Sequence, residues 1–167
     1  MRTICVDVDS TLCNHWERIA RFSENGVIQP EAFWEENVMA DEPLPGAIQA
    51  IGDLVAVTGA TICILTARDW DLPNGRVTEK WLDRCGFWWD HIRIVQRASE
   101  KPNVLRKVQA NLLIDDFMAG QELRYPKFDV QTYQECVYSG IPVEVFRNNW
   151  PEIVDRWLKN WGYDEAG

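Results

Sequence analysis

Short apolar runs alternate with stretches of helical spacing along the chain. The runs are nearly continuous and rich in β-branched residues, which is typical of strands buried on both faces of a sheet. Five strands are predicted, at Thr3–Val8, Thr61–Thr66, Ile92–Val95, Asn111–Ile114 and Pro142–Phe146. Apolar residues at helical spacing predict helices at Ala47–Val57, Thr78–Cys85, Pro102–Val108 and Pro151–Trp161. This alternation favours an α/β fold, a three-layer sandwich around a central parallel sheet.

One segment, residues 14–45, does not follow the alternation. It carries two amphipathic pieces, His15–Phe22 and Pro30–Val38, between the first strand and the first long helix. We interpret residues 14–45 as a small helical cap inserted beside the sheet, and a helical hairpin packed on one sheet face is the alternative. With no repeat or low-complexity linker, residues 1–167 are expected to form a single domain.

Composition excludes several classes of protein. Apolar residues make up 46% of the chain, as in soluble globular proteins, and no run is long enough to span a membrane. The N-terminus does not have the pattern of a signal peptide, so a cytoplasmic location is expected. The five cysteines form no CxxC pair, which argues against a zinc site or a disulfide framework. A net charge of -9 disfavours generic attraction to nucleic acid but allows a local basic pocket.

Acidic residues follow two of the predicted strands directly. Asp7 and Asp9 come at the end of the first strand, where alternation places both side chains on the same side. Asp115 and Asp116 follow the fourth strand. Clustered carboxylates repel one another unless a cation neutralises them, and such oxygen ligands suit Mg²⁺. Solvated turns or Asp helix caps are the alternative explanation of each pair.

Two further candidate residues are a threonine at the end of the second predicted strand and a lysine just before the third long helix. The second strand ends in Thr66-Ala67-Arg68, which could hold a phosphoryl oxygen or simply cap a helix. Lys101 precedes the third long helix, where its ammonium group could neutralise both Asp7 and a phosphate. Lys107 competes for that role, but it lies toward the far end of the predicted helix.

Together these motifs resemble those of the haloacid dehalogenase superfamily, whose members have a Rossmann-like sheet. Asp7-Val8-Asp9-Ser10-Thr11 is similar to its first motif, Thr66 to its second, Lys101 to its third and Asp115-Asp116 to its fourth. The resemblance implies that the first aspartate is a nucleophile that forms an aspartyl-phosphate. It also implies that Asp9 exchanges a proton with the leaving group and with water, and that its main-chain carbonyl binds the metal.

The same resemblance implies roles for the other residues. Thr66 is expected to bind the transferring phosphoryl group, Lys101 to steady Asp7 and the phosphate, and Asp116 to bind Mg²⁺ with help from Asp115. Because the dehalogenases of the superfamily lack an acid at the position of Asp9, a magnesium-dependent phosphatase is the expected enzyme. A catalytically silent module that binds a phosphate or a protein is the alternative from another class.

The expected substrate is a small phosphate ester such as a deoxynucleotide. Leu112-Leu113-Ile114-Asp115-Asp116 is similar to the corresponding stretch of 5′(3′)-deoxyribonucleotidases. Thr78–Leu82 after the TAR motif resembles the 3′-phosphatase domains of polynucleotide kinases, so a nucleic-acid 3′ end is the second candidate. Ala67, Arg68, Trp16 and Trp34 are the candidate substrate-binding residues, with the tryptophans stacking on a base. No membrane partner is expected, and the sequence does not reveal the oligomeric state.

Overall fold

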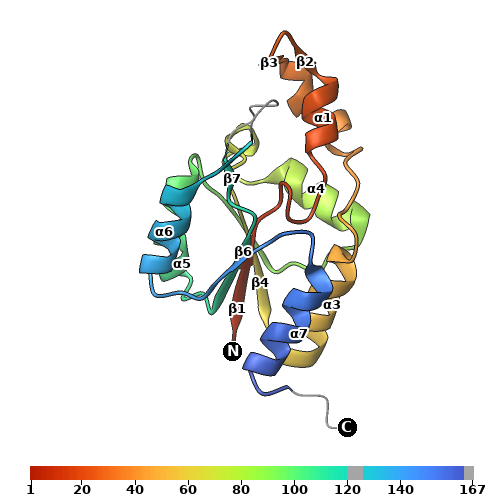
Figure 1. The fold of residues 1–167 in the computed structure, drawn as a ribbon. Helices are drawn as coiled ribbons and strands as arrows, with labels where there is room; N and C mark the ends of the chain where they lie inside the picture. The colour runs from red at the N-terminus through yellow and green to blue at the C-terminus, as the bar shows by residue number, and fades with distance from the viewer. Residues whose placement is uncertain (120–125, 164–167) are drawn as a thin grey trace.

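A parallel sheet forms the centre of the protein. The computed structural model describes residues 1–119 and 126–163, and its main sheet has the strand order β5-β4-β1-β6-β9 (Figure 1). The strands are β1 (Thr3–Val6), β4 (Thr61–Thr66), β5 (His91–Ile94), β6 (Leu112–Asp115) and β9 (Val143–Val145). Every neighbouring pair is parallel. The predicted α/β fold with a central parallel sheet is therefore confirmed.

Helices cover both faces of this sheet. On one face lie α3 (Ala47–Thr58), α4 (Arg76–Cys85) and α7 (Trp150–Asn160), and on the other α5 (Lys101–Lys107) and α6 (Val130–Tyr138) (Figure 1). Successive side chains of a strand point to opposite faces. In β1, Ile4 and Val6 pack into the core beneath α3 and α7, whereas Cys5 packs into the core beneath α5 and α6. Burial on both faces explains why the strands are continuously apolar.

The first strand is shorter than predicted. It ends at Val6, because the carbonyl of Val8 accepts hydrogen bonds from the N–H groups of Thr11, Leu12 and Cys13 instead of joining the sheet. Ser10 takes a left-handed conformation with a φ of 60°. The chain therefore turns sharply after Asp7, and Asp7 and Asp9 do not continue one strand as the sequence pattern suggested.

The first part of the segment 14–45 lies beyond the carboxyl ends of the strands, at the top of Figure 1, and its last residues run down past α4 toward α3. It contains the elements α1 (Trp16–Arg21), β2 (Ser23–Glu24), β3 (Val27–Ile28), the 3-10 helix η1 (Pro30–Phe33) and α2 (Glu35–Val38). The predicted second helix is interrupted because Trp34 is extended, with a ψ of 140°. The short β2–β3 hairpin was not predicted.

Three further elements connect the sheet strands. Two 3-10 helices, η2 (Asp69–Asp71) and η3 (Ala98–Glu100), follow β4 and β5, and a hairpin of β7 (Met118–Ala119) and β8 (Lys127–Phe128) follows β6. Helix α6 was not predicted, because its sequence is rich in residues that also favour strands. The Asp129 carboxylate caps it by accepting the N–H of Thr132 at 3.0 Å.

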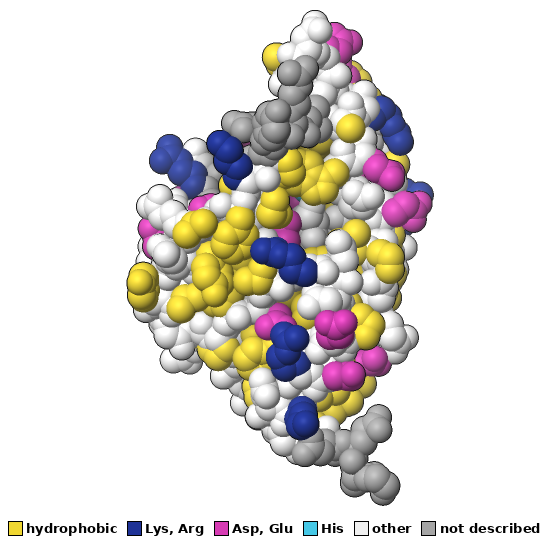
Figure 2. Space-filling model, viewed as in Figure 1, with side chains coloured by type: hydrophobic (Ala, Val, Ile, Leu, Met, Phe, Trp, Pro, Cys, Tyr) yellow, Lys and Arg dark blue, Asp and Glu magenta, His cyan; other side chains and the backbone are white. Residues whose placement is uncertain are grey.

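The surface mixes charged and apolar side chains. Figure 2 shows hydrophobic side chains gathered over α6, where Val130, Val137 and Tyr138 are exposed. Within residues 1–119 and 126–163, the helices are too short or too polar to cross a membrane.

Candidate active site

The carboxyl ends of the central strands carry the candidate residues. From β1 the chain continues to β4 on one side and returns later to β6 on the other, and such reversals of strand order are where α/β sheets bind ligands. A cavity of about 230 Å³ lies at this edge. The predicted site residues that line it are Asp7, Asp9, Thr66, Ala67, Lys101, Asp115 and Asp116. The fold thus brings together side chains that are far apart in the sequence.

Lys101 lies between two of the acids. Its Nζ atom is 3.2 Å from Asp7 Oδ1 and 2.6 Å from Asp115 Oδ2, and all three residues are buried. Pro102 in the first turn of α5 favours a helix start here, and Lys101 is the first residue of that helix. Lys107 instead lines a separate cavity with Thr3 and Thr61 at the amino ends of the strands. Of the two candidate lysines, the structure places Lys101 beside Asp7.

Three carboxylates surround one small space. Asp7, Asp115 and Asp116 each offer an oxygen, and these atoms lie within 4.8 Å of one another. Both oxygens of Asp115 are engaged, one by Lys101 and the other by the N–H of Phe117 at 2.8 Å. Asp116 is buried and forms no ion pair with any residue that the structure describes. Three acids against one lysine leave an excess of negative charge that fits a hard divalent cation such as Mg²⁺.

The pKa values of these groups reflect the same imbalance. Burial first, and then the negative charge of Asp115, raise the pKa of Asp7 to about 7. Burial and the charges of Asp7 and Asp115 raise the pKa of Asp116 to about 9. Burial alone would lower the pKa of Lys101, but Asp115 and Asp7 outweigh it and raise that pKa above its ordinary value. Lys101 is therefore a cation at neutral pH, whereas Asp116 and part of Asp7 hold protons that a metal ion would displace.

A dependence of stability on pH and metal follows from these shifts. Asp7 and Asp116 bind protons more tightly in the folded than in the unfolded chain. Their protonation therefore contributes fully to the free energy of unfolding below about pH 4, and this contribution is lost as the pH rises. We expect the melting temperature in a chelator to fall between about pH 6 and about pH 9 because of these two groups. Mg²⁺ should raise it more at the higher pH, where its ligands are deprotonated.

Thermal unfolding with and without Mg²⁺ at the two pH values measures this effect. Asp116→Asn serves as the comparison, because it preserves the shape of the side chain without its titration. The variant should show a flatter pH dependence and a smaller response to Mg²⁺. An equal Mg²⁺ response at both pH values in the unmodified protein would contradict the assignment.

Asp9 is held by arginine rather than by the acid cluster. Arg68 donates two hydrogen bonds to its carboxylate, from Nε to Oδ2 at 3.1 Å and from Nη2 to Oδ1 at 2.8 Å. Burial would raise the pKa of Asp9, but the charge of Arg68, followed by that of His15, outweighs it and holds that pKa well below its usual range. Asp9 is therefore ionised in this structure. That state suits acceptance of a proton from water, whereas donation to a leaving group requires a proton that Arg68 disfavours.

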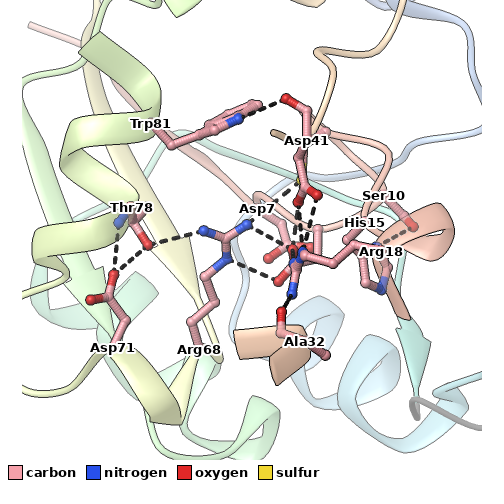
Figure 3. Close-up of polar contacts among 12 residues, drawn as sticks. Asp7, Ser10, His15, Arg18, Ala32, Asp41, Arg68, Asp71, Thr78 and Trp81 are labelled. Carbon is pink, nitrogen blue, oxygen red and sulfur yellow. Dashed lines mark hydrogen bonds and ion pairs between the residues drawn. The ribbon is translucent and has the colours of Figure 1, made fainter. Parts of the chain in front are cut away.

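A second arginine links Asp9 to the segment 14–45. Arg18 on α1 donates from Nε to Asp41 at 3.0 Å and from Nη1 to the carbonyl of Ala32 at 2.6 Å, and its Nη2 lies 3.9 Å from Asp9. Figure 3 shows Arg18 reaching in from the right and Arg68 from below, with Thr78 and Asp71 on the left of Arg68, and both guanidinium groups lie against Asp9. Two buried arginines thus neutralise the Asp9 carboxylate, and the role of its main-chain carbonyl as a metal ligand stays a prediction.

Three predicted substrate-binding residues need correction or refinement. Arg68 does not line the cavity, because it is buried and its N–H groups are bonded to Asp9 and, at 3.2 Å, to Thr78. Trp34 is 52% exposed and lines neither of the two cavities at this edge. Trp16 lines a neighbouring cavity with Asp116.

Sequence reasoning missed three residues of the site. His15 lines the cavity, and its Nδ1 lies 3.1 Å from Ser10 Oγ. Arg18 and Asp41 form the buried pair described above. A histidine six residues after the second acid was visible in the sequence, but nothing in the spacing of Arg18 and Asp41 indicated that they meet.

Comparison with solved structures identifies the fold. A haloacid dehalogenase-like hydrolase from Streptococcus pneumoniae superposes with a TM-score of 0.58 at 15% identity, covering 86% of this chain and 83% of that one. L-2-haloacid dehalogenase from Xanthobacter autotrophicus, with chloropropionic acid covalently bound, gives a TM-score of 0.54 at 11% identity, with coverages of 86% and 76%. The chain therefore has the haloacid dehalogenase-like fold, as its motifs predicted.

A third similar structure is part of a larger assembly. A chain of a Pnkp1/Rnl/Hen1 complex matches with a TM-score of 0.51 at 15% identity, over 87% of this chain and 45% of that one. No protein-family model matches the sequence, and no curated protein sequence is significantly similar to it. At these identities the likeness concerns the fold, so the chemistry must be argued from the site.

Proposed function

We propose that this protein is a magnesium-dependent phosphomonoester hydrolase that acts through an aspartyl-phosphate on Asp7, with a nucleotide as its substrate. The observation that carries the proposal is the buried cluster of Asp7, Asp115 and Asp116 around a single lysine. A dehalogenase that uses no metal has no need of three clustered carboxylates. Asp9, which the dehalogenases of the superfamily lack, supports the same conclusion.

The nucleophile is positioned by its neighbours. Asp7 Oδ1 is bound to Lys101 at 3.2 Å, which restricts rotation of the carboxylate and leaves its second oxygen to attack phosphorus. The new bond joins that oxygen to phosphorus as the bond to the ester oxygen breaks. The ester oxygen leaves with the electron pair and takes a proton from solvent, to which Asp9 later returns the proton that it accepts from the attacking water. Lys101 and the hydroxyl of Thr66, which lines the same cavity, stabilise the charge that develops on the phosphoryl oxygens.

Hydrolysis of the intermediate needs a base. Water attacks phosphorus and breaks its bond to Asp7, which restores the carboxylate and releases inorganic phosphate. Asp9 is ionised and lines the cavity, so it is the group that accepts the proton of this water. Arg68 fixes the direction of the Asp9 carboxylate through its two hydrogen bonds. Bound to Asp7 and Asp116, Mg²⁺ would supply positive charge that offsets the phosphate oxygens.

Hydrolysis of a generic aryl phosphate with and without Mg²⁺ tests the reaction class. Turnover that requires Mg²⁺ and exceeds that of an Asp7→Asn control is the expected result. If no turnover is found, the protein is instead a silent module that binds a phosphate or a protein. Release of halide from a 2-haloacid without phosphatase activity would also contradict the proposal, because it would identify the protein as a dehalogenase.

The nature of the substrate requires a panel of phosphate esters. Nucleoside monophosphates, sugar phosphates and 3′-phosphorylated oligonucleotides should be compared by kcat/KM under the same conditions. We expect nucleotides to be the best substrates, with the 3′ end of a strand as the second candidate. Sugar phosphates as the best substrates would overturn the nucleotide assignment while leaving the phosphatase assignment in place.

A further inference from the structure

A second cavity adjoins the acid cluster. Its volume is about 440 Å³, within the range of small-molecule sites, and it lies among the loops that follow β1, β6 and β9. Asp116 and Met118 line both this cavity and the one that contains Asp7. The two cavities therefore adjoin at Asp116 and Met118, next to the acid cluster, where a group esterified to a bound phosphate would lie.

An aromatic surface runs from one cavity to the other. His15 lines the first cavity and Trp16 the second, and their ring centroids are 4.2 Å apart with a tilt of 42°. Ser10, which also lines the second cavity, holds His15 through the contact between Oγ and Nδ1 at 3.1 Å. Trp16 is half-buried, so one part of its ring packs against the protein and the rest is accessible. Such a ring can stack on a planar group of the ligand.

The rest of the second cavity is polar. Asn14 and Asn148 supply amide groups that both donate and accept hydrogen bonds, which suits the edge of a base. Arg147 is anchored, because its Nη1 donates to the carbonyls of Asp116 and Phe146, each at 3.0 Å. Its guanidinium group lies 5.2 Å from the centre of the Phe128 ring. Its Nε and Nη2 atoms bond to no residue within 1–119 or 126–163, which leaves donors for an anionic or carbonyl oxygen.

We propose that the second cavity is the leaving-group subsite and that it binds the nucleoside portion of a nucleotide, with the base stacked on Trp16. This inference rests on the proposed phosphatase function and names the part of the substrate that the acid cluster does not contact. An aromatic platform, two amides and an anchored guanidinium match the flat face, polar edge and oxygen-rich backbone of a nucleotide unit. A sugar phosphate without a base offers nothing for the Trp16 ring to stack on.

The test compares substrates with and without a base. Trp16→Ala should lower the ratio of kcat/KM for a nucleoside 3′-monophosphate to kcat/KM for ribose 5-phosphate by at least about fivefold, the lower end of measured base–aromatic stacking. Trp16→Phe should restore most of the ratio, because it keeps an aromatic face. Trp88→Ala is the matched control, because Trp88 is 55% exposed and lies outside both cavities. An unchanged ratio in Trp16→Ala overturns the subsite.

A binding measurement separates this inference from the proposed function. In the Asp7→Asn protein with Mg²⁺, the Trp16 indole N–H resonance, identified by its loss in Trp16→Phe, should shift with 2′-deoxyadenosine 3′-monophosphate but not with ribose 5-phosphate. A shift without turnover of any phosphate ester by the unmodified protein would reject the phosphatase and keep the subsite. Turnover of nucleotides with no shift would reject the subsite alone.

A third substrate identifies the source of the nucleotide. A 3′-phosphorylated dinucleotide places a phosphodiester next to the terminal nucleoside, within the reach of an anchored arginine. A higher kcat/KM for the dinucleotide than for the mononucleotide assigns the subsite to a strand end. The opposite order assigns it to a free nucleotide, and both results keep Trp16 as the stacking platform.

Discussion

Asp7→Asn is expected to lower kcat/KM for an aryl phosphate by at least about 10⁴-fold, because an amide oxygen cannot act as the nucleophile and losses of a nucleophile reach this size or more. The substitution preserves size, and the amide oxygen can still accept the hydrogen bond from Lys101, which lies 3.2 Å from Asp7 Oδ1. The folded structure should therefore persist. Steady-state kinetics at saturating Mg²⁺ measures the effect.

The control for Asp7→Asn is stability and ligand binding. Asp7 carries a raised pKa caused by burial and by Asp115, so its replacement by a neutral group relieves repulsion at high pH. We expect a melting temperature at about pH 8 that is equal to or above that of the unmodified protein in a chelator. Activity similar to that of the unmodified protein would exclude Asp7 as the nucleophile and would require another acid of the cluster in that role.

Lys101→Met should be the second most damaging substitution at the site. It removes the ammonium group that contacts both Asp7 and Asp115 and leaves three buried carboxylates without a cation. We expect kcat/KM to fall by about 10²–10³-fold, the scale observed when one preorganised electrostatic contact is lost. Methionine has a similar length, so the loss reports charge more than packing.

Lys107→Met is the matched control for Lys101→Met. Lys107 belongs to the same helix, but it is exposed and lines a cavity at the opposite edge of the sheet. Its substitution should change kcat/KM by less than about twofold, as is usual for surface residues that contact nothing reactive. A structural role of Lys101 alone would lower the melting temperature without changing kcat. Loss of kcat at a temperature where both variants are folded distinguishes the two roles, and equal kinetic losses would contradict the assignment.

The strands and their tips were predictable because the signals are local. A strand buried on both faces must be continuously apolar, and the first acids after it must lie at its carboxyl end. Asp7 and the Asp115–Asp116 pair could therefore be placed at one sheet edge from the order of motifs alone. Lys101 could be preferred over Lys107 because position along a helix fixes distance from its start.

The direction and the partners of the Arg68 side chain could not be predicted in the same way. Its position after β4 indicates the correct edge of the sheet, but its direction depends on Asp9 and on Thr78, which the chain brings close only by folding. The same holds for Arg18 and Asp41, which are joined through a segment without regular periodicity. The partners in such buried charge pairs are brought together by the tertiary fold, and no periodic pattern in the sequence indicates them.

Helix α6 illustrates a second kind of miss. Val130, Thr132, Tyr133 and Val137 are residues that strands also favour, so propensity argued against a helix. The Asp129 cap and packing against Phe117 and Phe128 decide the conformation instead. Tertiary contacts outweigh weak local preference in this part of the chain.

The contact between α1 and the sheet edge restricts how this protein can be re-engineered. Exchanging residues 14–45 for the equivalent segment of a relative would remove Arg18 together with Asp41, while Asp9 and Arg68 would stay in the recipient. In a chimera of this kind, Asp9 would lose one of its two neighbouring guanidinium groups in addition to having a new segment above the site. Donor segments should therefore be chosen first for a guanidinium at the position of Arg18, and only then for their shape.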